Sequence, residues 1–269
     1  MIARWLGSHR IDLDECSSTN DEAGRLARAG ARHGTVVIAL AQRAGRGREG
    51  RPWASPPGTG LYLSAVVRPP LPLADVPPMT LAIGIGVCDA ARAMGVPAQL
   101  KWPNDALVCE GEQQRKLAGV LIEAQSQGAR LESVVIGIGV NIRPLGPDVP
   151  TDVAARAISL EEAAGMTIDR EVFIATLLGH VEHWVDRYIA MGVETIIPAW
   201  TERMAHGLVA RAMIDGAPQI GELAGLDSDG ALLVRMSSGT THRVRSGDVE
   251  LVTPHTTDAR PAEVAQATC

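Results

Sequence analysis

Apolar residues along the chain form two kinds of pattern, and each predicts a different kind of element. Short runs rich in branched apolar residues, bounded by polar or Gly/Pro positions, predict strands. These runs lie at 35–41, 60–67, 99–108 with a break at Pro103, 116–123 and 131–141. Apolar residues spaced three or four positions apart predict helices. That spacing occurs at 79–94, 159–164 and 169–190.

The residue pattern changes after residue 204, and this change predicts a second, smaller unit. Short β runs there are separated by Asp215-Gly216, Asp229-Gly230 and Ser238-Gly239, which are typical hairpin turns. The final residues are small and polar. We therefore expect a main domain over 1–203, a compact β-barrel over 204–253 and a disordered tail over 254–269.

Composition narrows the class of protein. The 269 residues are 46% hydrophobic and 21% charged, as in a soluble globular protein, and the 3% aromatic content predicts an aliphatic core. The net charge of -6 argues against a general nucleic-acid binder. Cys16, Cys88, Cys109 and Cys269 lack zinc-ligand spacing. With no signal peptide and no stretch of membrane-spanning length expected, these thiols indicate a cytoplasmic protein.

One basic segment stands out against this acidic background, Gly45-Arg46-Gly47-Arg48-Glu49-Gly50-Arg51. Glycines allow close backbone approach, and arginines bind phosphate and carboxylate oxygens. Prolines soon follow, so no helix opens here as a dinucleotide fingerprint requires, and the lysine of a P-loop is missing. A basic surface loop is the simpler interpretation. Its place between two predicted strands instead favours a ligand-binding lid, in which Trp53 could cover a ligand ring.

Two polar clusters each allow a structural and a functional interpretation. Thr19 and Glu22 have capping-box spacing, and this cap is sufficient reason for the polar segment. Alternatively, Ser18, Thr19 and Asn20 face an uncharged polar ligand head. The second cluster consists of Lys101, Asn104 and Asp105. It is either an ordinary Pro-Asn-Asp turn or a phosphate and magnesium site.

Three further features fall inside predicted regular elements. Lys116 opens an apolar strand, where a lysine either extends to solvent or points into a site. Gly137 and Gly139 interrupt a strand, which indicates that a ligand or another backbone passes close by. His180 and His183 lack an evident third metal ligand, so we interpret them as helix surface residues.

Taken in series, these segments resemble the catalytic core of the biotin protein ligases. The resemblance covers roughly residues 12 to 252 and rests on the order and spacing of four motifs. The motifs are Ser18-Thr19-Asn20, the loop from Gly45 through Trp53 and Ser55-Pro56, Lys101-Trp102-Pro103-Asn104-Asp105, and Lys116-Leu117-Ala118-Gly119 with Gly137-Ile138-Gly139-Val140-Asn141. It implies an α+β fold. The expected architecture is a mixed, largely antiparallel sheet with helices on one side, as in class II synthetases, and a C-terminal SH3-like β-barrel.

The resemblance also implies a reaction and a set of site residues. Biotin and ATP would form biotinyl-5'-AMP with Mg²⁺, and the biotinyl group would pass to a lysine of a biotin carboxyl carrier domain, such as that of acetyl-CoA carboxylase. The catalytic cations would be Lys116, Arg48 and Lys101. Biotin would contact Ser18, Thr19, Asn20, Gln42, Gly45, Arg46, Arg48, Lys116 and Gly119. ATP would contact Arg46, Arg48, Trp53, Lys101, Asn104 and Asn141, with Asp105 as the magnesium ligand.

The sequence departs from the family pattern at two places, and two other functions are also considered. Glu49 and the lack of an arginine at Val252 could weaken nucleotide binding. The catalytic pattern begins near Ile11 without a helix-turn-helix, so we expect no DNA binding, and a monomer or homodimer without membrane contact. Lipoate ligase is the nearest rival, although the Ser18-Thr19-Asn20 and Lys116 motifs favour biotin. A non-catalytic nucleic-acid-binding module is the rival from another class, disfavoured by charge.

Overall fold

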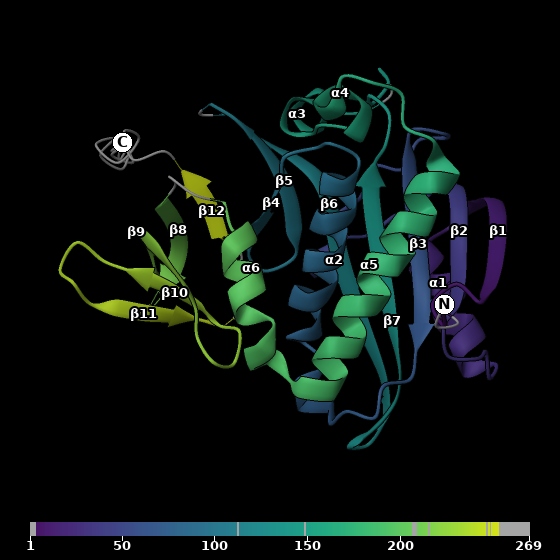
Figure 1. Cartoon of the computed structure of the whole chain (residues 1–269), viewed down its shortest axis with the longest axis horizontal. Coiled ribbons are helices and arrows are strands. Elements are labelled where there is room, and N and C mark those ends of the chain that lie inside the picture. The colour runs from purple at the N-terminus through teal and green to yellow at the C-terminus, as the bar shows by residue number, and fades with distance from the viewer. Residues whose placement is uncertain are drawn as a thin grey trace, which may run out of the picture.

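Two β-sheets organise the chain, a seven-stranded sheet and a five-stranded sheet (Figure 1). The computed structural model describes residues 4–252 apart from 112, 148, 206–208, 215, 246 and 248. The large sheet has the spatial order β1-β2-β3-β7-β6-β5-β4. Its strands are β1 (His9–Cys16), β2 (Thr35–Gln42), β3 (Gly60–Val67), β4 (Ala98–Lys101), β5 (Asp105–Glu110), β6 (Gln113–Gln127) and β7 (Arg130–Asn141). Only β1 and β2 run parallel among these neighbours, which confirms a mixed, largely antiparallel sheet.

Alternate residues of the large sheet face two different layers of helices. On one face Ile136, Ile138 and Val140 of β7 join the main core beneath α2 (Met79–Ala93) and α5 (Arg170–Met191). On the other face Val135 packs with Ala23 of α1 (Thr19–Arg28). The expectation of helices on one side was therefore incomplete. The helix α1 lies on the opposite face, because its small alanines pack against the second set of strand side chains.

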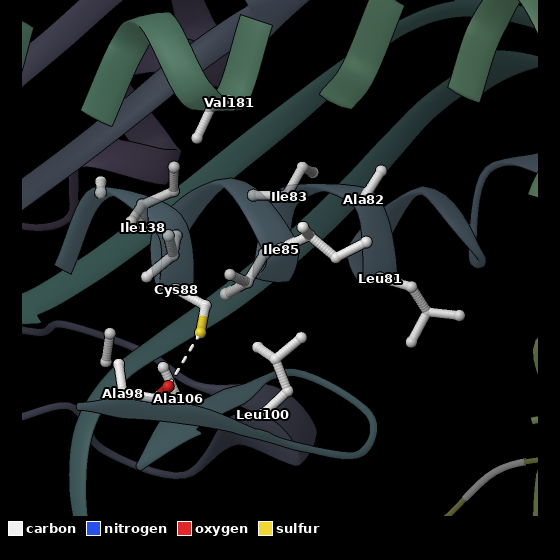
Figure 2. Packing of buried hydrophobic residues seen from close by; sticks show 14 of the residues in the cluster. Leu81, Ala82, Ile83, Ile85, Cys88, Ala98, Leu100, Ala106, Ile138 and Val181 are labelled. Atoms are coloured by element: carbon white, nitrogen blue, oxygen red, sulfur yellow. Dashed lines mark hydrogen bonds between the residues drawn. The ribbon is translucent and has the colours of Figure 1, made fainter. Parts of the chain in front are cut away.

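Close packing of α2 against α5 depends on a glycine. A Cβ at Gly86 would lie 2.8 Å from the Cα of Val181, so a larger residue would separate the two helices. Figure 2 shows Val181 of α5 next to α2, with Cys88 of α2 directed toward β4. The Cys88 thiol donates to the carbonyl of Ala98 at 3.2 Å. The small residues of α2 thus serve helix–helix contact as well as the expected contact with the sheet.

Helix α5 presents its predicted apolar face to the core. Its side chains Phe173, Leu177, Val181, Trp184 and Tyr188 are all buried, as the spacing predicted. The stretch Leu73–Ala93 is long and apolar enough to cross a membrane, contrary to expectation. It includes the 3-10 turn η2 (Leu73–Asp75) and α2, and 61% of its most apolar window is buried inside the protein, as in a core helix of a soluble protein.

The remaining helices are short and lie in connections. They are α3 (Thr151–Arg156), α4 (Leu160–Ala164), α6 (Ile197–Arg203) and the 3-10 turns η1 (Arg48–Gly50), η2 (Leu73–Asp75) and η3 (Val193–Thr195). A capping box is present at α4, where Ser159 and Glu162 bond to each other's backbone. The capping box predicted at Thr19 was wrong. Helix α1 has Ser18 at its N-cap and no side-chain cap, because the Thr19 hydroxyl donates to the Gln42 side chain instead.

The small sheet packs beside the β4 edge of the large sheet (Figure 1). Its strands, in the order β11-β10-β9-β8-β12, are β8 (Val209–Ile214), β9 (Ala217–Leu226), β10 (Leu232–Arg235), β11 (Thr241–Val244) and β12 (Val249–Val252). Gly216, Gly230 and Gly239 adopt positive φ in the predicted turns, although Asp215 and the predicted tail 254–269 lie outside the described residues. The Trp102 indole donates to the carbonyl of Gly230 at 3.1 Å, which joins the two sheets.

Candidate active site

A cavity of about 310 Å³ lies on the α1 side of the large sheet. It brings together every predicted site residue except Gly45 and Asn141. The predicted residues among its lining are Ser18, Thr19, Asn20, Gln42, Arg46, Arg48, Trp53, Lys101, Asn104, Asp105, Lys116 and Gly119. They come from the start of α1, the end of β2, the β2–β3 loop, the β4–β5 corner and β6. Residues as far apart in sequence as Ser18 and Gly119 therefore share one site.

Glycines form the floor of this cavity. A Cβ at Gly139 would lie 2.6 Å from an atom of the Trp53 ring, and one at Gly137 would lie 2.2 Å from the Asn20 side-chain oxygen. Side chains therefore approach these glycines closely, whereas the sequence led us to expect a ligand or another backbone. Gly119 pairs with Gly139 across β6 and β7 and extends the same floor. The missing side chains leave room for Asn20 and Trp53 to lie against the sheet.

One end of the cavity is polar and uncharged. The backbone N–H and hydroxyl of Thr19 donate to Gln42 Oε1 at 2.8 and 3.1 Å, and Gln42 Nε2 donates to the Ser55 hydroxyl at 2.9 Å. The Ser64 hydroxyl donates to Asn20 Oδ1 at 2.6 Å. These hydrogen bonds orient donors and acceptors in advance of any ligand. Such an end suits an uncharged head that both donates and accepts hydrogen bonds.

The other end of the cavity is cationic. The Lys116 ammonium lies 2.7 Å from Asp105 and 5.2 Å from the centre of the Trp53 ring. Burial lowers the pKa of Lys101, with the nearby charge of Lys116 acting in the same direction, while Asp105 opposes the shift. Bringing an anion between these lysines would relieve their repulsion. This end therefore suits a phosphate or carboxylate.

Two buried polar atoms at this end lack a hydrogen-bond partner among the described residues. They are the Trp53 indole nitrogen and Asp105 Oδ1, the latter held only by its ionic contact with Lys116. An unpartnered buried N–H is costly unless a ligand satisfies it. Within the described part of the chain, no group of three or more His, Cys, Asp or Glu side chains could hold a metal. His180 and His183 accordingly form no such group.

Gly45 and Asn141 support the site from outside its lining. The Asn141 amide donates to the backbone carbonyls of Lys116 at 3.1 Å and Ile158 at 3.2 Å, which holds the start of β6 in place. Gly45 accepts from the Trp53 backbone N–H at 2.8 Å, and its Cβ would lie 2.6 Å from the Trp53 carbonyl. These contacts explain the residue types without a direct ligand contact.

The small sheet forms one wall of the cavity, which the sequence did not indicate. Val249 and Glu250 of β12 belong to the lining, and Arg48 Nη1 donates to the carbonyl of Gly247 at 3.5 Å. Glu49, the acidic departure, is absent from the lining and pairs with Arg51 at 2.9 Å. Its backbone adopts φ +56°, a left-handed conformation that costs a non-glycine residue about 1 kcal/mol. Its carboxylate therefore pairs with the Arg51 guanidinium and does not line the cavity.

This fold and cavity define a class of ligases that activate a carboxylic acid with a nucleotide. Residues 15–141 match the biotin/lipoate A/B protein ligase family, and residues 212–252 match the biotin protein ligase C-terminal domain. The chain belongs to the biotin protein ligase family.

Relatives with assigned names agree with this membership. The biotin acetyl-CoA-carboxylase ligase of Paracoccus denitrificans is 33% identical over 84% of this chain and 94% of that protein. The bifunctional ligase/repressor BirA of Bacillus subtilis is 36% identical over 91% of this chain and 75% of that protein. Among solved structures, the Aquifex aeolicus biotin protein ligase in complex with biotin and ATP aligns with a TM-score of 0.75 and 26% identity, covering 91% of this chain and 99% of that one.

Proposed function

We propose that this protein activates biotin with ATP and transfers the biotinyl group to a lysine of a carrier domain. A carboxylate oxygen of biotin attacks the α-phosphorus of ATP, and pyrophosphate leaves. The lysine amine of the carrier then attacks the carbonyl carbon of the mixed anhydride, which forms an amide and releases AMP. The observation that carries the proposal is one cavity with an uncharged polar end and a cationic end, built on a glycine floor.

Each end of the cavity meets one physical demand of this chemistry. Thr19, Gln42 and Asn20 offer the ureido ring of biotin the donors and acceptors it needs. Joining a carboxylate to a phosphate brings two anions together, so fixed cations supply most of the catalysis. Lys116, Lys101 and Arg48 line the site, together with Arg46 and Arg51. No protein nucleophile is required, since the anhydride is already an activated acyl donor.

We propose that the nucleotide lies at the Trp53 end of the cavity. The unpartnered indole N–H of Trp53 is available to a polar atom of the adenylate. Asn104 donates to the carbonyl of Val120 at 2.9 Å, so its side-chain oxygen remains the group that could face ATP. Asn141 acts on the same end through the backbone of Lys116.

Magnesium is proposed as the ion that accompanies ATP. Asp105 is the carboxylate nearest the cationic end, and its partner is Lys116. Mg²⁺ commonly takes one or two carboxylates together with substrate phosphates and water, so a single aspartate fits a metal delivered with the nucleotide. Bound Mg²⁺ would neutralise phosphate charge. The ion pair with Lys116 would hold Asp105 ready at the same place.

We propose that a wider hollow of about 1220 Å³ next to the site receives the carrier domain. The hollow and the catalytic cavity have Arg48, Trp102, Pro103 and Asn104 in common, so they lie side by side at the β4–β5 corner. An acceptor lysine of a biotin carboxyl carrier domain would approach the cationic end of the cavity from this corner.

We propose a catalytic unit over 1–203 and an SH3-like unit over 204–253, in agreement with the two separate family matches. A cytoplasmic monomer or homodimer without a DNA partner fits the net charge of -6 and the free thiols of Cys16, Cys88 and Cys109.

Pyrophosphate exchange into ATP tests the function directly. The purified protein is incubated with ATP, Mg²⁺ and labelled pyrophosphate, with biotin, with lipoate or with neither acid. Exchange that depends on biotin is the expected result. Exchange supported by lipoate and not by biotin would assign the chain to the lipoate side of the family. Salt-sensitive binding to DNA or RNA without any exchange would overturn the enzyme assignment.

A further inference from the structure

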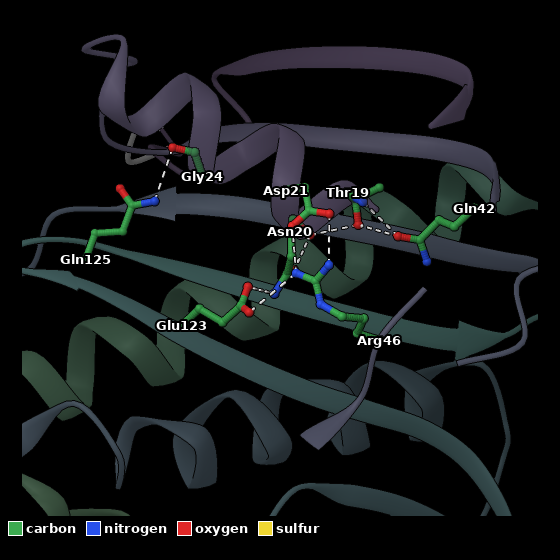
Figure 3. A network of polar contacts seen from close by, with 9 residues as sticks. Thr19, Asn20, Asp21, Gly24, Gln42, Arg46, Glu123 and Gln125 are labelled. Atoms are coloured by element: carbon green, nitrogen blue, oxygen red, sulfur yellow. Dashed lines mark hydrogen bonds and ion pairs between the residues drawn. The ribbon is translucent and has the colours of Figure 1, made fainter. Parts of the chain in front are cut away.

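Arg46 connects the β2–β3 loop to two elements of the protein body. Its guanidinium donates to both oxygens of Asp21, at 2.8 and 2.6 Å, and lies 3.6 Å from Glu123 (Figure 3). Asp21 is in the first turn of α1, and Glu123 is on β6. The loop, a helix and a central strand, far apart in sequence, therefore meet at one side chain. Bidentate pairing with a carboxylate fixes the direction of a guanidinium as well as its position.

Glu123 has a second role at this junction. Its carboxylate accepts a hydrogen bond from Asn20 Nδ2 at 2.7 Å. A carboxylate only accepts, so Asn20 must turn its NH₂ toward Glu123 and its oxygen toward the Ser64 hydroxyl. The orientation of an amide at the polar end of the cavity is therefore set by the same carboxylate that pairs with Arg46.

We propose that Asp21 and Glu123 form a catch on Arg46 that holds the loop 43–53 over the cavity, and that Glu123 simultaneously orients Asn20 toward biotin. The proposal rests on the proposed function, because the molecule retained beneath the loop is the biotinyl adenylate. Asp21 is absent from the cavity lining, and so is Glu123. Both are positioning residues that act through Arg46 and Asn20.

The strength of the catch suits a loop that must also open. The side chains of Arg46, Asp21 and Glu123 are 36%, 49% and 41% exposed, so solvent screens their attraction. We expect each carboxylate to change the balance between held and released loop by about fivefold. The hydrogen bonds from Arg46 lower the pKa of Asp21, which keeps its carboxylate charged near neutral pH. A stronger lock would slow the release of the loop when the carrier arrives.

Proteolysis of the ligand-free protein tests the catch without any assumption about biotin. Trypsin cleavage after Arg48 is timed by mass spectrometry in the unmodified protein and in Asp21→Asn, Asp21→Glu and Glu22→Gln. Glu22 is the matched control, since it also lies in the first turn of α1 and pairs only with Arg25 of the same helix, at 3.0 Å, among the described residues. We expect cleavage to be about fivefold faster in Asp21→Asn than in the unmodified protein. The rates in the other two variants should equal that of the unmodified protein.

Retention of the adenylate tests the link to catalysis. Labelled adenylate is formed on the enzyme, free pyrophosphate is removed, and the label that escapes is followed over time. Asp21→Asn is expected to release it about fivefold faster, with biotin-dependent pyrophosphate exchange still present. Glu123→Gln keeps an oxygen acceptor for Asn20 and should mainly speed release. Glu123→Ala removes that acceptor as well, so it should also raise the KM for biotin about tenfold.

The outcomes separate the catch from the proposed function. Equal cleavage rates in Asp21→Asn and Glu22→Gln would overturn the catch, whatever the enzyme does with biotin. Equal KM values for biotin in Glu123→Gln and Glu123→Ala would overturn the orienting role of Glu123. Faster cleavage in Asp21→Asn combined with an absence of biotin-dependent exchange in the unmodified protein would leave the catch in place and remove biotin as the ligand.

Discussion

The ammonium of Lys116 and the carboxylate of Asp105 lie 2.7 Å apart on neighbouring strands of the large sheet. The Lys116 side chain is 37% exposed and that of Asp105 is 14% exposed, so the pair is fixed at its buried end and open at its cationic end. The Asn141 amide holds the backbone of Lys116 by donating a hydrogen bond to its carbonyl. The lysine is thus positioned before a ligand arrives, which is what electrostatic catalysis requires.

Replacing Lys116 by alanine is expected to abolish most activation of biotin while the protein stays folded. The variant loses one of the cations proposed to meet the reacting anions, and losses of about 10²–10³-fold are typical for one such group. Biotin-dependent pyrophosphate exchange measures the effect, with circular dichroism to check folding. In Asp105→Asn the lysine loses only its anchor, so a smaller loss is expected. An unchanged exchange rate in Lys116→Ala would remove this residue from its proposed role.

Gly139→Ala is expected to displace the Trp53 ring. The added Cβ would lie 2.6 Å from a ring atom, a distance that forces one of the two groups to move. Overpacking of this kind costs about 1–3 kcal/mol, so we expect the KM for ATP to rise about tenfold or more. Gly146→Ala is the control, since its Cβ meets no atom within 4 Å. Equal KM values in the two variants would contradict the role of Gly139 as a seat for Trp53.

Arg203→Ala is expected to destabilise the fold by about 3 kcal/mol. Arg203 of α6 pairs with Asp89 of α2 at 2.6 Å, and both side chains are largely buried, at 15% and 14% exposed. Among the described residues, removing the arginine leaves the Asp89 carboxylate with the Trp184 indole as its side-chain hydrogen-bond donor, at 2.9 Å. Urea unfolding measures the change in the free energy of unfolding.

The matched control for this prediction is Arg156→Ala. Arg156 also ends a short helix and pairs with a carboxylate, Asp152, but their side chains are 74% and 72% exposed. Exposed pairs contribute about 0.5 kcal/mol or less. If Arg203→Ala lowers the free energy of unfolding no more than Arg156→Ala does, burial of the α2–α6 ion pair adds nothing to stability.

Stability is expected to fall on mild acidification because of His33. Burial lowers the pKa of this histidine, and its Nδ1 accepts from the backbone N–H of Arg68 at 3.0 Å, which requires the neutral ring. Below about pH 6.5, the usual pKa of histidine, His33 is protonated in the unfolded chain but stays neutral in the folded protein. The stabilising contribution is therefore complete above pH 6.5 and lost as pH falls toward the lowered value. Urea midpoints between pH 5 and 8 should depend less on pH in His33→Gln.

Local sequence patterns predicted the strands well where one face is continuously buried. The run 60–67 coincides with β3, and the apolar face of α5 was found residue by residue. Most predicted site residues also meet in one cavity, because the family motifs mark the ends of strands and loops that the sheet brings together. These features depend on periodicity and on motif order, both of which are visible in the sequence.

Long-range hydrogen bonds account for what local patterns missed. Thr19 has the spacing of a cap, but Gln42, 23 positions away, takes its hydroxyl. Ser64 and Glu123 bond to Asn20 from 44 and 103 positions away, and no local motif marks either one. The contribution of β12 to the cavity wall likewise follows from the packing of the small sheet on the β4 edge. Such partners become evident only when the strand order is known.

The alternation along β7 makes catalysis sensitive to strand register. Ile136, Ile138 and Val140 point into the core, while Gly137 and Gly139 point into the site. A slip of one residue against β3 or β6 would exchange the two sets. Branched side chains would then fill the binding floor, and glycines would leave holes beneath α2. A protein with a misaligned β7 would thus lose both stability and activity. The strand register that packs the core is the same register that places the glycines on the floor of the cavity.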